Sequence, residues 1–471
     1  MRFLVIGVVL SFVLAVPAAA QDPPPADPAR IAALIARLGD AQFQAREEAS
    51  AALRELGGAA LDALRAACAS DDAEIASRAR LLVRAIEVDL TPTPWACRQR
   101  RAALAAEHGG TDRTEAAIDA GLAWLARHQD EDGRWDARGF AKHDAAGAPS
   151  TGAAKLEWVD PGVTGLALLA FLGADHSHRQ GTHKEVVKNA LKFLLKVQTA
   201  DGRIGGDEGH YLYNHGIGTL ALVDAYGVTK SPLLKDPATR ALAYLVAARN
   251  PAKAWRYGSR DGDNDISVTS WAVAALHLGR LAELEVDGAD QALRDARAYV
   301  GEITVEGGPI AGYKSRPPRG WTGPTSARFQ SDEIGVNTAN THKANHTPTA
   351  IAAMCRLWCG GVPPRAEWND VAAALAAIPP AWPDAVGAEP SPADLYYWYY
   401  ASLAMFQAGG EAWTTWNAAV IRTLLTRQAT TGSEAGSWPT DDAWGFAGGR
   451  VQTTALAVLI LQTYYRYPRA R

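Results

Sequence analysis

The sequence repeats one kind of segment from about residue 160 to its C-terminus. Each copy is apolar and rich in small residues, and most copies end at Gly, a residue that commonly terminates helices. A series of similar apolar helices constrains the fold strongly, because each helix must bury its surface against its neighbours. The six copies are Gly162–Gly173, Gly216–Gly227, Ser267–Gly279, Thr347–Gly360, Tyr396–Gly409 and Val451–Tyr465.

The copies follow one another at a regular interval. Each has a Ser, Thr or Gly near its start, and these aligned positions are Thr164, Gly218, Thr269, Thr349, Ser402 and Thr454. The intervals are 54, 51, 80, 53 and 52 residues, so one interval carries roughly thirty extra residues. Residues 307–345 are rich in Gly, Pro, Ser and Asn, and we expect the insertion to be a long loop there.

A second set of predicted helices alternates with the first and is more charged, as solvent-facing helices should be. Six helix pairs with the apolar set inside predict an all-α fold, an (α/α)6 toroid over residues 111–467. An open solenoid is the alternative, but it would expose a large apolar face. The second set spans residues 114–128, 184–197, 237–249, 289–303, 368–378 and 413–427.

The N-terminus has the pattern of a secretory signal over residues 1–20. Arg2 supplies the positive start, an apolar run follows, and Ala18-Ala-Ala precedes the expected cleavage point. A membrane anchor is the alternative, although the run is short for a spanning helix. We therefore expect an exported protein, bacterial periplasmic or extracellular, with no membrane-spanning segment after cleavage.

Residues 21–29 are a Pro-rich linker, and residues 30–90 form a helical block that precedes the toroid. Two phrases in this block, Leu38-Gly-Asp…Ala45-Arg-Glu-Glu-Ala-Ser and Asp71-Asp-Ala-Glu-Ile-Ala-Ser-Arg-Ala, resemble HEAT-type repeats. The resemblance implies a small helical domain that packs against or binds another protein. Residues 91–110 connect this domain to the toroid.

Composition narrows the range of functions. Hydrophobic residues make up 48% of the chain and charged residues 21%, which indicates a globular protein. The formal net charge of -4 gives no indication of nucleic-acid binding. The four cysteines fit buried small hydrophobic residues better than a disulfide framework.

Several charged helices end in a shared motif. The first copy has Gln129, Gly133 and Trp135, and the last has Gln428, Gly436 and Trp438. A further copy, Gln198-Thr-Ala-Asp-Gly-Arg-Ile, has Ile204 at the Trp position. This motif resembles the Gln-Trp repeat of squalene and hopene cyclases and of the wider terpene cyclase and prenyltransferase superfamily. The resemblance covers about residues 111–467 and implies the toroid fold.

The family resemblance also implies an acid. Terpene cyclases protonate an alkene or epoxide with an Asp from an Asp-x-Asp-Asp motif at the start of an inner helix. Here Asp263 falls on the first carboxylate of that motif and Asp265 on the proton donor, while Ile266 replaces the last Asp. The structural alternative is that Asp263 and Asp265 cap the helix and order its loop.

The prenyltransferase branch binds zinc at the same helix start. Asp265-Ile-Ser267 matches part of that site and His346 resembles its later His, but Ser267 stands where the thiolate ligand belongs. A hydroxyl is a poor zinc ligand, so the sequence predicts no metal and no cofactor.

The loops that lead into the inner helices should converge at one mouth of the toroid. Such a rim, acidic with histidines and aromatic rings, could bind an apolar ligand or a carbohydrate. A non-catalytic binding or scaffold protein is our leading interpretation. The alternatives are a terpene-cyclase-like enzyme using Asp265 and a carbohydrate-active toroid. The predicted rim residues are Asp160, His210, His215, His346, Trp398, Tyr399, Asp441, Asp442, Trp444 and Arg450.

Overall fold

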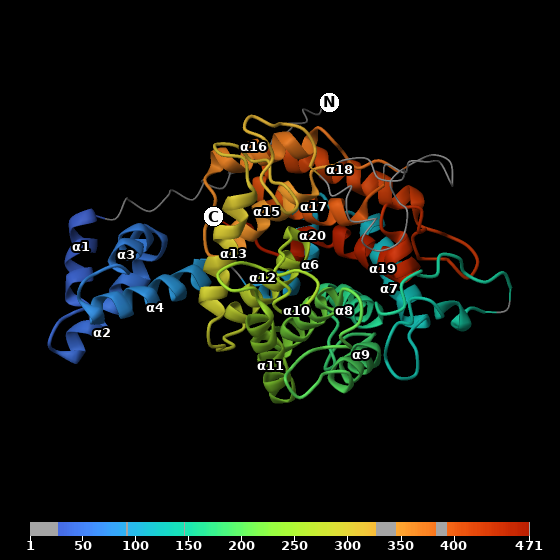
Figure 1. Cartoon of the computed structure of the whole chain (residues 1–471), viewed down its shortest axis with the longest axis horizontal. Helices are drawn as coiled ribbons and strands as arrows, with labels where there is room; N and C mark the ends of the chain where they lie inside the picture. Colours follow the sequence, from blue (N-terminus) through green and yellow to red (C-terminus); the bar gives the residue numbers. More distant parts are fainter. Residues whose placement is uncertain (1–26, 91–92, 146, 326–344, 383–392, 471) are drawn as a thin grey trace, which may run out of the picture. The chain divides into compact units, whose positions relative to one another are not determined.

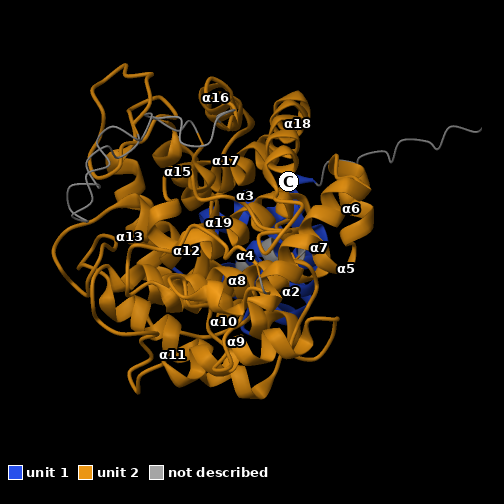
Figure 2. Ribbon diagram, turned by 90° about the vertical axis from the view of Figure 1, so that its right-hand side faces the viewer, with its two compact units in different colours: residues 1–90 blue, residues 91–471 orange. Residues whose placement is uncertain are grey.

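The computed structural model describes residues 27–90, 93–145, 147–325, 345–382 and 393–470. Its internal contacts divide the chain into two compact units, Met1–Leu90 and Thr91–Arg471 (Figure 2). The predicted signal segment, residues 1–20, lies outside the described residues, as does the middle of the predicted loop at 307–345. All four cysteines are described, and none forms a disulfide.

The first unit is a small helical bundle with its own core. Apolar side chains from each of its four α-helices meet there, among them Ile31, Leu53, Leu64 and Ile86. The HEAT-like character of this unit stays a prediction. Its helices are α1 (Pro28–Arg37), α2 (Phe43–Leu56), η1 (Gly57–Ala60), α3 (Leu61–Ala67) and α4 (Ala73–Leu90).

The second unit contains a closed ring of six inner helices, which confirms the predicted toroid (Figure 1). Each inner helix packs against the next in chain order, and α19 returns to pack against α8. These helices are buried along most of their length, as their composition requires. They are α8 (Asp160–Gly173), α10 (Tyr211–Thr229), α12 (Ile266–Leu281), α15 (Thr347–Trp358), α17 (Leu395–Ala408) and α19 (Gly445–Leu461).

Six outer helices surround this ring, and each packs against inner helices through one face only. In the outer helix α13, for example, Leu293, Ala296 and Val300 are buried while the residues between them are mostly exposed. The outer helices are α7 (Asp112–Arg127), α9 (Lys184–Lys196), α11 (Pro232–Ala248), α13 (Ala289–Ile303), α16 (Arg365–Ala376) and α18 (Gly410–Arg427). The remaining helices are α5 (Pro94–Gln99), α6 (Arg101–His108), η2 (Phe140–His143) and α20 (Thr463–Arg466).

The Gln-Trp motif ties the outer helices that carry it to their neighbours. Gln428 Nε2 donates to the carbonyls of Ala117, 2.8 Å away, and Gly436, 2.9 Å away. The indole of Trp438 donates to the Leu424 carbonyl at 2.8 Å, and its backbone N–H donates to the Thr454 hydroxyl at 3.2 Å. These links join the end of α18 to α7, to the loop that follows α18 and to α19.

The imperfect copy of the motif is compensated within the wall of the toroid. Ile204 replaces Trp and Gly218 replaces the aligned Thr, so no hydroxyl can accept the Ile204 N–H. His215 Nδ1 accepts it instead at 3.0 Å, while Nε2 donates to the Ala241 carbonyl at 3.1 Å. Burial lowers the pKa of His215 to about 3, so the imidazole is neutral. His215 therefore supports the fold at this position.

The far end of the ring is closed by a buried charge cluster. Asp224 on α10 accepts hydrogen bonds from Arg98 at 2.9 Å, from Arg466 at 3.3 Å and from the Trp95 indole at 3.0 Å. Arg466 also donates to the Leu169 carbonyl of α8 at 2.7 Å. This cluster joins the segment before the ring to the segment after it.

Replacing Gly436 by Ala should destabilise the toroid far more than replacing Gly432. Both glycines have positive φ, 98° and 69°, so both variants carry the left-handed strain of roughly 1–2 kcal/mol. Only at Gly436 would the new Cβ meet a backbone atom, the Ala120 carbonyl oxygen, at 2.3 Å; at Gly432 nothing lies within 4 Å. We expect Gly436→Ala to lose about 3 kcal/mol or more in thermal unfolding. Equal losses in the two variants would contradict the packing.

Candidate functional site

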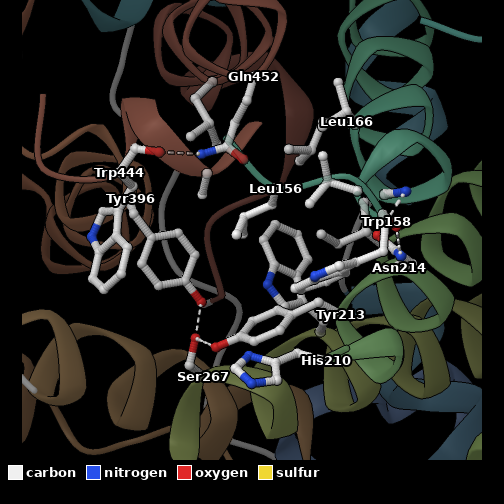
Figure 3. Close-up of a pocket in the computed structure, with 17 residues that line it drawn as sticks. Leu156, Trp158, Leu166, His210, Tyr213, Asn214, Ser267, Tyr396, Trp444 and Gln452 are labelled. Atoms are coloured by element: carbon white, nitrogen blue, oxygen red, sulfur yellow. Dashed lines mark hydrogen bonds between the residues drawn. The ribbon is translucent and has the colours of Figure 1, made fainter. Parts of the chain in front are cut away.

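A cavity of about 130 Å³ lies among the N-terminal halves of the inner helices (Figure 3). Helices α8, α10, α12, α17 and α19 contribute to its wall, mostly with residues from their N-terminal halves. This is the mouth at which we expected the connecting loops to converge. Six rings line the cavity: Trp158, His210, Tyr213, Trp271, Tyr396 and Trp444.

The wall of the cavity is mostly apolar. Among the described residues that line it, none is Asp, Glu, Lys or Arg. Its hydroxyl groups bond to one another: Tyr213 donates to Ser267 at 2.8 Å, and Ser267 and Tyr396 share a hydrogen bond of 2.6 Å. These bonds connect α10, α12 and α17 across the ring, so the three hydroxyl groups of the wall are already paired (Figure 3).

Below the cavity the centre of the ring is filled by side chains. Trp271 of α12 stacks on Tyr399 of α17 with ring centroids 5.9 Å apart. Ser270 and Tyr400 of the same two helices share a hydrogen bond of 2.7 Å. Because α12 and α17 are not neighbours in the ring, contacts between them occupy its centre. The described part of the ring thus has a shallow cavity at its mouth above a packed interior.

Asp265 caps α12 from within the protein. It is fully buried, and Oδ1 accepts the Val268 N–H at 2.8 Å, while Oδ2 lies 3.9 Å from Arg256 Nε. Burial raises the pKa of Asp265 to about 7, against the opposing effects of the Val268 N–H, the Tyr313 hydroxyl and the Arg256 charge. Asp265 is absent from the lining of the cavity, although Ser267, two residues later, is present.

Asp263, the other predicted acid, lies in a different environment. It is partly exposed and forms ion pairs with Arg256 and Lys314. Burial acts to raise its pKa, but the hydrogen bonds from Lys314 and the Asn264 N–H and the charge of Arg256 lower it overall. The two carboxyl groups of the motif therefore have opposite tendencies, Asp265 toward the neutral form and Asp263 toward the charged form.

A second carboxyl group with a raised pKa, that of Asp442, lies just before α19. Burial, and then the charge of Asp394, raise the pKa of Asp442 to about 7. Asp394 itself caps α17 through the Tyr397 N–H at 2.8 Å and accepts from Asn345 at 2.7 Å. Asp441 accepts from the Trp382 indole at 3.0 Å. Asp442 also lies outside the cavity lining, two residues before Trp444.

Two predicted rim residues line the cavity, His210 and Trp444. His210 stacks on Tyr257 with ring centroids 3.5 Å apart and an interplanar angle of 3°. Asp160 begins α8 and accepts the Ala137 N–H at 3.0 Å.

The other predicted rim residues are placed within the wall or the core. Arg450 is buried and donates to Thr151, to Ser437 and to the Trp438 carbonyl, which fixes a loop against α19. His346 precedes α15, and burial lowers its pKa. Trp398 and Tyr399 are each 1% exposed in the core of the ring.

Three aromatic residues of the cavity were not expected at the site from sequence: Trp158, Trp271 and Tyr396. Trp271 and Tyr396 lie within the first two turns of inner helices, where side chains that turn inward must face the mouth. The position of Trp271 and Tyr396 near the start of a repeated inner helix is therefore the sequence signal that could have placed them at the cavity. Trp158 lies on a loop, and no sequence pattern indicated its direction.

Among the described residues we find neither a cluster of metal ligands nor a membrane-spanning helix. These residues contain no group of three or more His, Cys, Asp or Glu side chains arranged to hold a metal ion. In the same residues, every helix is too short or too polar to cross a membrane.

Comparisons with known proteins identify the fold. Searches among protein families and curated proteins found no match. Cellobiose 2-epimerase from Bacillus thermoamylovorans B4167 is similar in structure, with a TM-score of 0.50 and 12% identity over 74% of this chain and 97% of the epimerase. The fold is an α/α toroid. At this identity the similarity does not extend to the reaction.

Two other solved structures show weaker similarity. An alpha-amylase from Clostridium perfringens has a TM-score of 0.49 and 11% identity, over 74% of this chain and 97% of the amylase. The type II terpene cyclase MstE from Scytonema has a TM-score of 0.45 and 15% identity, over 75% of this chain and 97% of the cyclase.

Asp265→Asn should change how stability depends on pH. The pKa of Asp265 is raised from its usual 3.8 to about 7 in the folded state, so the folded protein binds the extra proton between these values. The wild type should therefore lose stability relative to Asp265→Asn as pH rises from about 4 to 7, by up to roughly 4 kcal/mol. Asn also caps helices well, so the cap itself is kept. Thermal unfolding of both proteins across pH 5–8 measures the difference.

Asp263→Asn is the matched control for this experiment. Its folded-state pKa is lowered, so its contribution to stability is lost only as pH falls below the usual value of 3.8. The difference in stability between Asp263→Asn and the wild type should stay constant between pH 5 and 7. If the difference in stability between Asp265→Asn and the wild type were also constant over this pH range, Asp265 would not be held neutral in the folded protein.

Proposed function

We propose that this protein is an exported toroid that binds a small ligand in the aromatic cavity at the mouth of its inner ring. The observation that supports this most directly is the convergence of six rings on one mostly apolar cavity. A concave, mostly apolar site with a few fixed polar groups is the usual form of a small-molecule site. Export follows from the signal pattern at residues 1–20, and a protein partner for residues 30–90 is part of the same proposal.

The size of the cavity defines what it can hold. Drug-sized ligands occupy sites of about 300–1,000 Å³, and an engineered cavity of about 150 Å³ holds benzene. At about 130 Å³ this cavity suits a group no larger than one ring. A polyprene chain would have to extend outside it, because Trp271 and Tyr399 fill the space below. The ligand is therefore a small molecule or the compact end of a larger one.

Binding without chemistry is favoured over catalysis by the position of the acids. A general acid must lie within hydrogen-bond reach of the group that it protonates. Neither Asp265 nor Asp442 is among the residues that line the cavity. A glycosidase would need two carboxyl groups facing the sugar, which disfavours the carbohydrate-active alternative for the same reason.

Filling the cavity should abolish binding. Ala447 lines the cavity, and Ala447→Phe would occupy it, whereas Ala200→Phe adds the same side chain at an exposed loop position. We expect ring-sized probes such as phenol and cyclohexanol to bind the wild type and Ala200→Phe saturably in isothermal titration calorimetry. Ala447→Phe should show at least a tenfold loss. Undiminished binding in Ala447→Phe, or no binding of any probe to the wild type, would contradict the proposal.

Acid catalysis on an isoprenoid is the second candidate, favoured by one observation. The raised pKa of Asp265 keeps a carboxylic acid available near neutral pH, two residues from the cavity wall. If this candidate is correct, purified protein should convert squalene or a shorter isoprenoid, and Asp265→Asn should lose that turnover while keeping its fold. Product analysis by mass spectrometry tests it. Turnover that survives in Asp265→Asn, or none in the wild type, would exclude it.

A further inference from the structure

The rings of the cavity come from separate segments and enclose it from several directions. Trp158 lies before α8, Tyr213 in the first turn of α10, and Tyr396 in the first turn of α17. Trp444 lies on the side of Tyr396, and Trp158 and His210 lie opposite (Figure 3). The faces of aromatic rings are electron-rich and attract cations, most strongly where water is excluded. A cavity with such walls favours a positively charged guest over a neutral guest of the same shape.

The hydroxyl and amide groups of the wall leave few acceptors for a ligand that donates hydrogen bonds. Tyr213, Ser267 and Tyr396 bond to one another. Asn214 accepts the Gly162 N–H at 3.1 Å and donates to the Trp158 carbonyl, and Gln452 donates to the Trp444 carbonyl at 3.4 Å. A sugar or a primary ammonium ion would bring several donors that need partners. A quaternary ammonium group brings none.

Charges near the cavity also favour a cation. Asp265 and Asp442 lie two residues before Ser267 and Trp444 of the wall, and both are ionised above pH 7. The guanidinium of Arg256 is engaged by Asp263 and lies over the Tyr257 ring, with Cζ 4.4 Å from the centroid. The titratable and charged groups around the two carboxyl groups are Arg256, Asp263, Lys314, Tyr213, Tyr257, Tyr299, Tyr313 and Tyr396 for Asp265, and Asp394 and Asp441 for Asp442.

We infer that the ligand of this cavity carries a quaternary ammonium group, held by cation–π contacts with the surrounding rings. The inference rests on the proposed ligand-binding function and names the class of ligand. A trimethylammonium group is compact, apolar on its surface and without donors, so it suits a ring-sized cavity whose hydroxyl groups are already paired. The remainder of such a ligand would extend from the mouth.

Choline and its neutral isostere 3,3-dimethyl-1-butanol test the inference, because they share shape and differ in charge. At pH 8 we expect choline to bind the full-length protein at least tenfold more tightly than the isostere in isothermal titration calorimetry, which is about 1.4 kcal/mol. Tetramethylammonium should compete with choline. Ala447→Phe should bind neither choline nor the isostere.

Variants separate the contribution of the rings from that of folding. Trp444→Phe keeps a ring in the wall and Trp444→Leu does not, so choline affinity should fall at least fivefold further in the Leu variant. Asp265→Asn and Asp442→Asn should weaken the binding of choline and leave the binding of the isostere unchanged. Binding of the isostere also shows that each variant is folded.

Two outcomes would overturn the inference, and they differ in what else they affect. Equal affinity for choline and the isostere would mean that the cavity selects apolar shape alone, and the proposed ligand-binding function would stand. Failure of choline, the isostere, phenol and cyclohexanol to bind would overturn the inference together with the proposed function.

Discussion

The structure depends on one hydrogen bond that recurs around the ring. The backbone N–H that follows a charged helix donates to the hydroxyl near the start of the next apolar helix, as in Trp135 to Thr164 at 3.0 Å and Trp255 to Thr269 at 3.2 Å. Each bond satisfies a buried backbone donor and fixes a loop over the N-terminal end of an inner helix. The mouth of the toroid is built from these loops, so its shape follows from that repeated contact.

This contact also explains why the fold could be predicted from the sequence. The hydroxyl must occupy the same position in each copy, so the aligned positions recur every 51 to 54 residues, apart from the one interval of 80 residues that carries the insertion. The copy that lacks it shows the limit of such a prediction. Gly218 leaves room for Ile204, whose side chain a new Cβ would meet at 3.0 Å, and His215 takes over as acceptor. A pairwise exchange of this kind has no signature in a single chain.

The candidate site was predicted less completely, for a physical reason. Residues at the start of a helix can cap it, face the mouth or fix a neighbouring loop, and local sequence does not separate these roles. The capping role that the sequence offered for Asp265 is confirmed, since its Oδ1 accepts the Val268 N–H at the start of α12. The direction of Trp158, Trp271 and Tyr396 depends on contacts between segments far apart in the chain, such as the stacking of Trp271 on Tyr399. Such contacts exist only once the ring has closed.

The ionisation of the buried acids is coupled to the charge of a guest in the cavity. Because Asp265 is fully buried, its pKa rises to about 7. A cation in the cavity would favour the ionised form of Asp265 and of Asp442, so binding would release protons between pH 6 and 8. By linkage, the affinity for a cation must then increase with pH over this range, whereas a neutral guest of the same shape has no such dependence. The same burial that keeps these carboxyl groups out of the cavity therefore makes them sensitive to the charge of what occupies it.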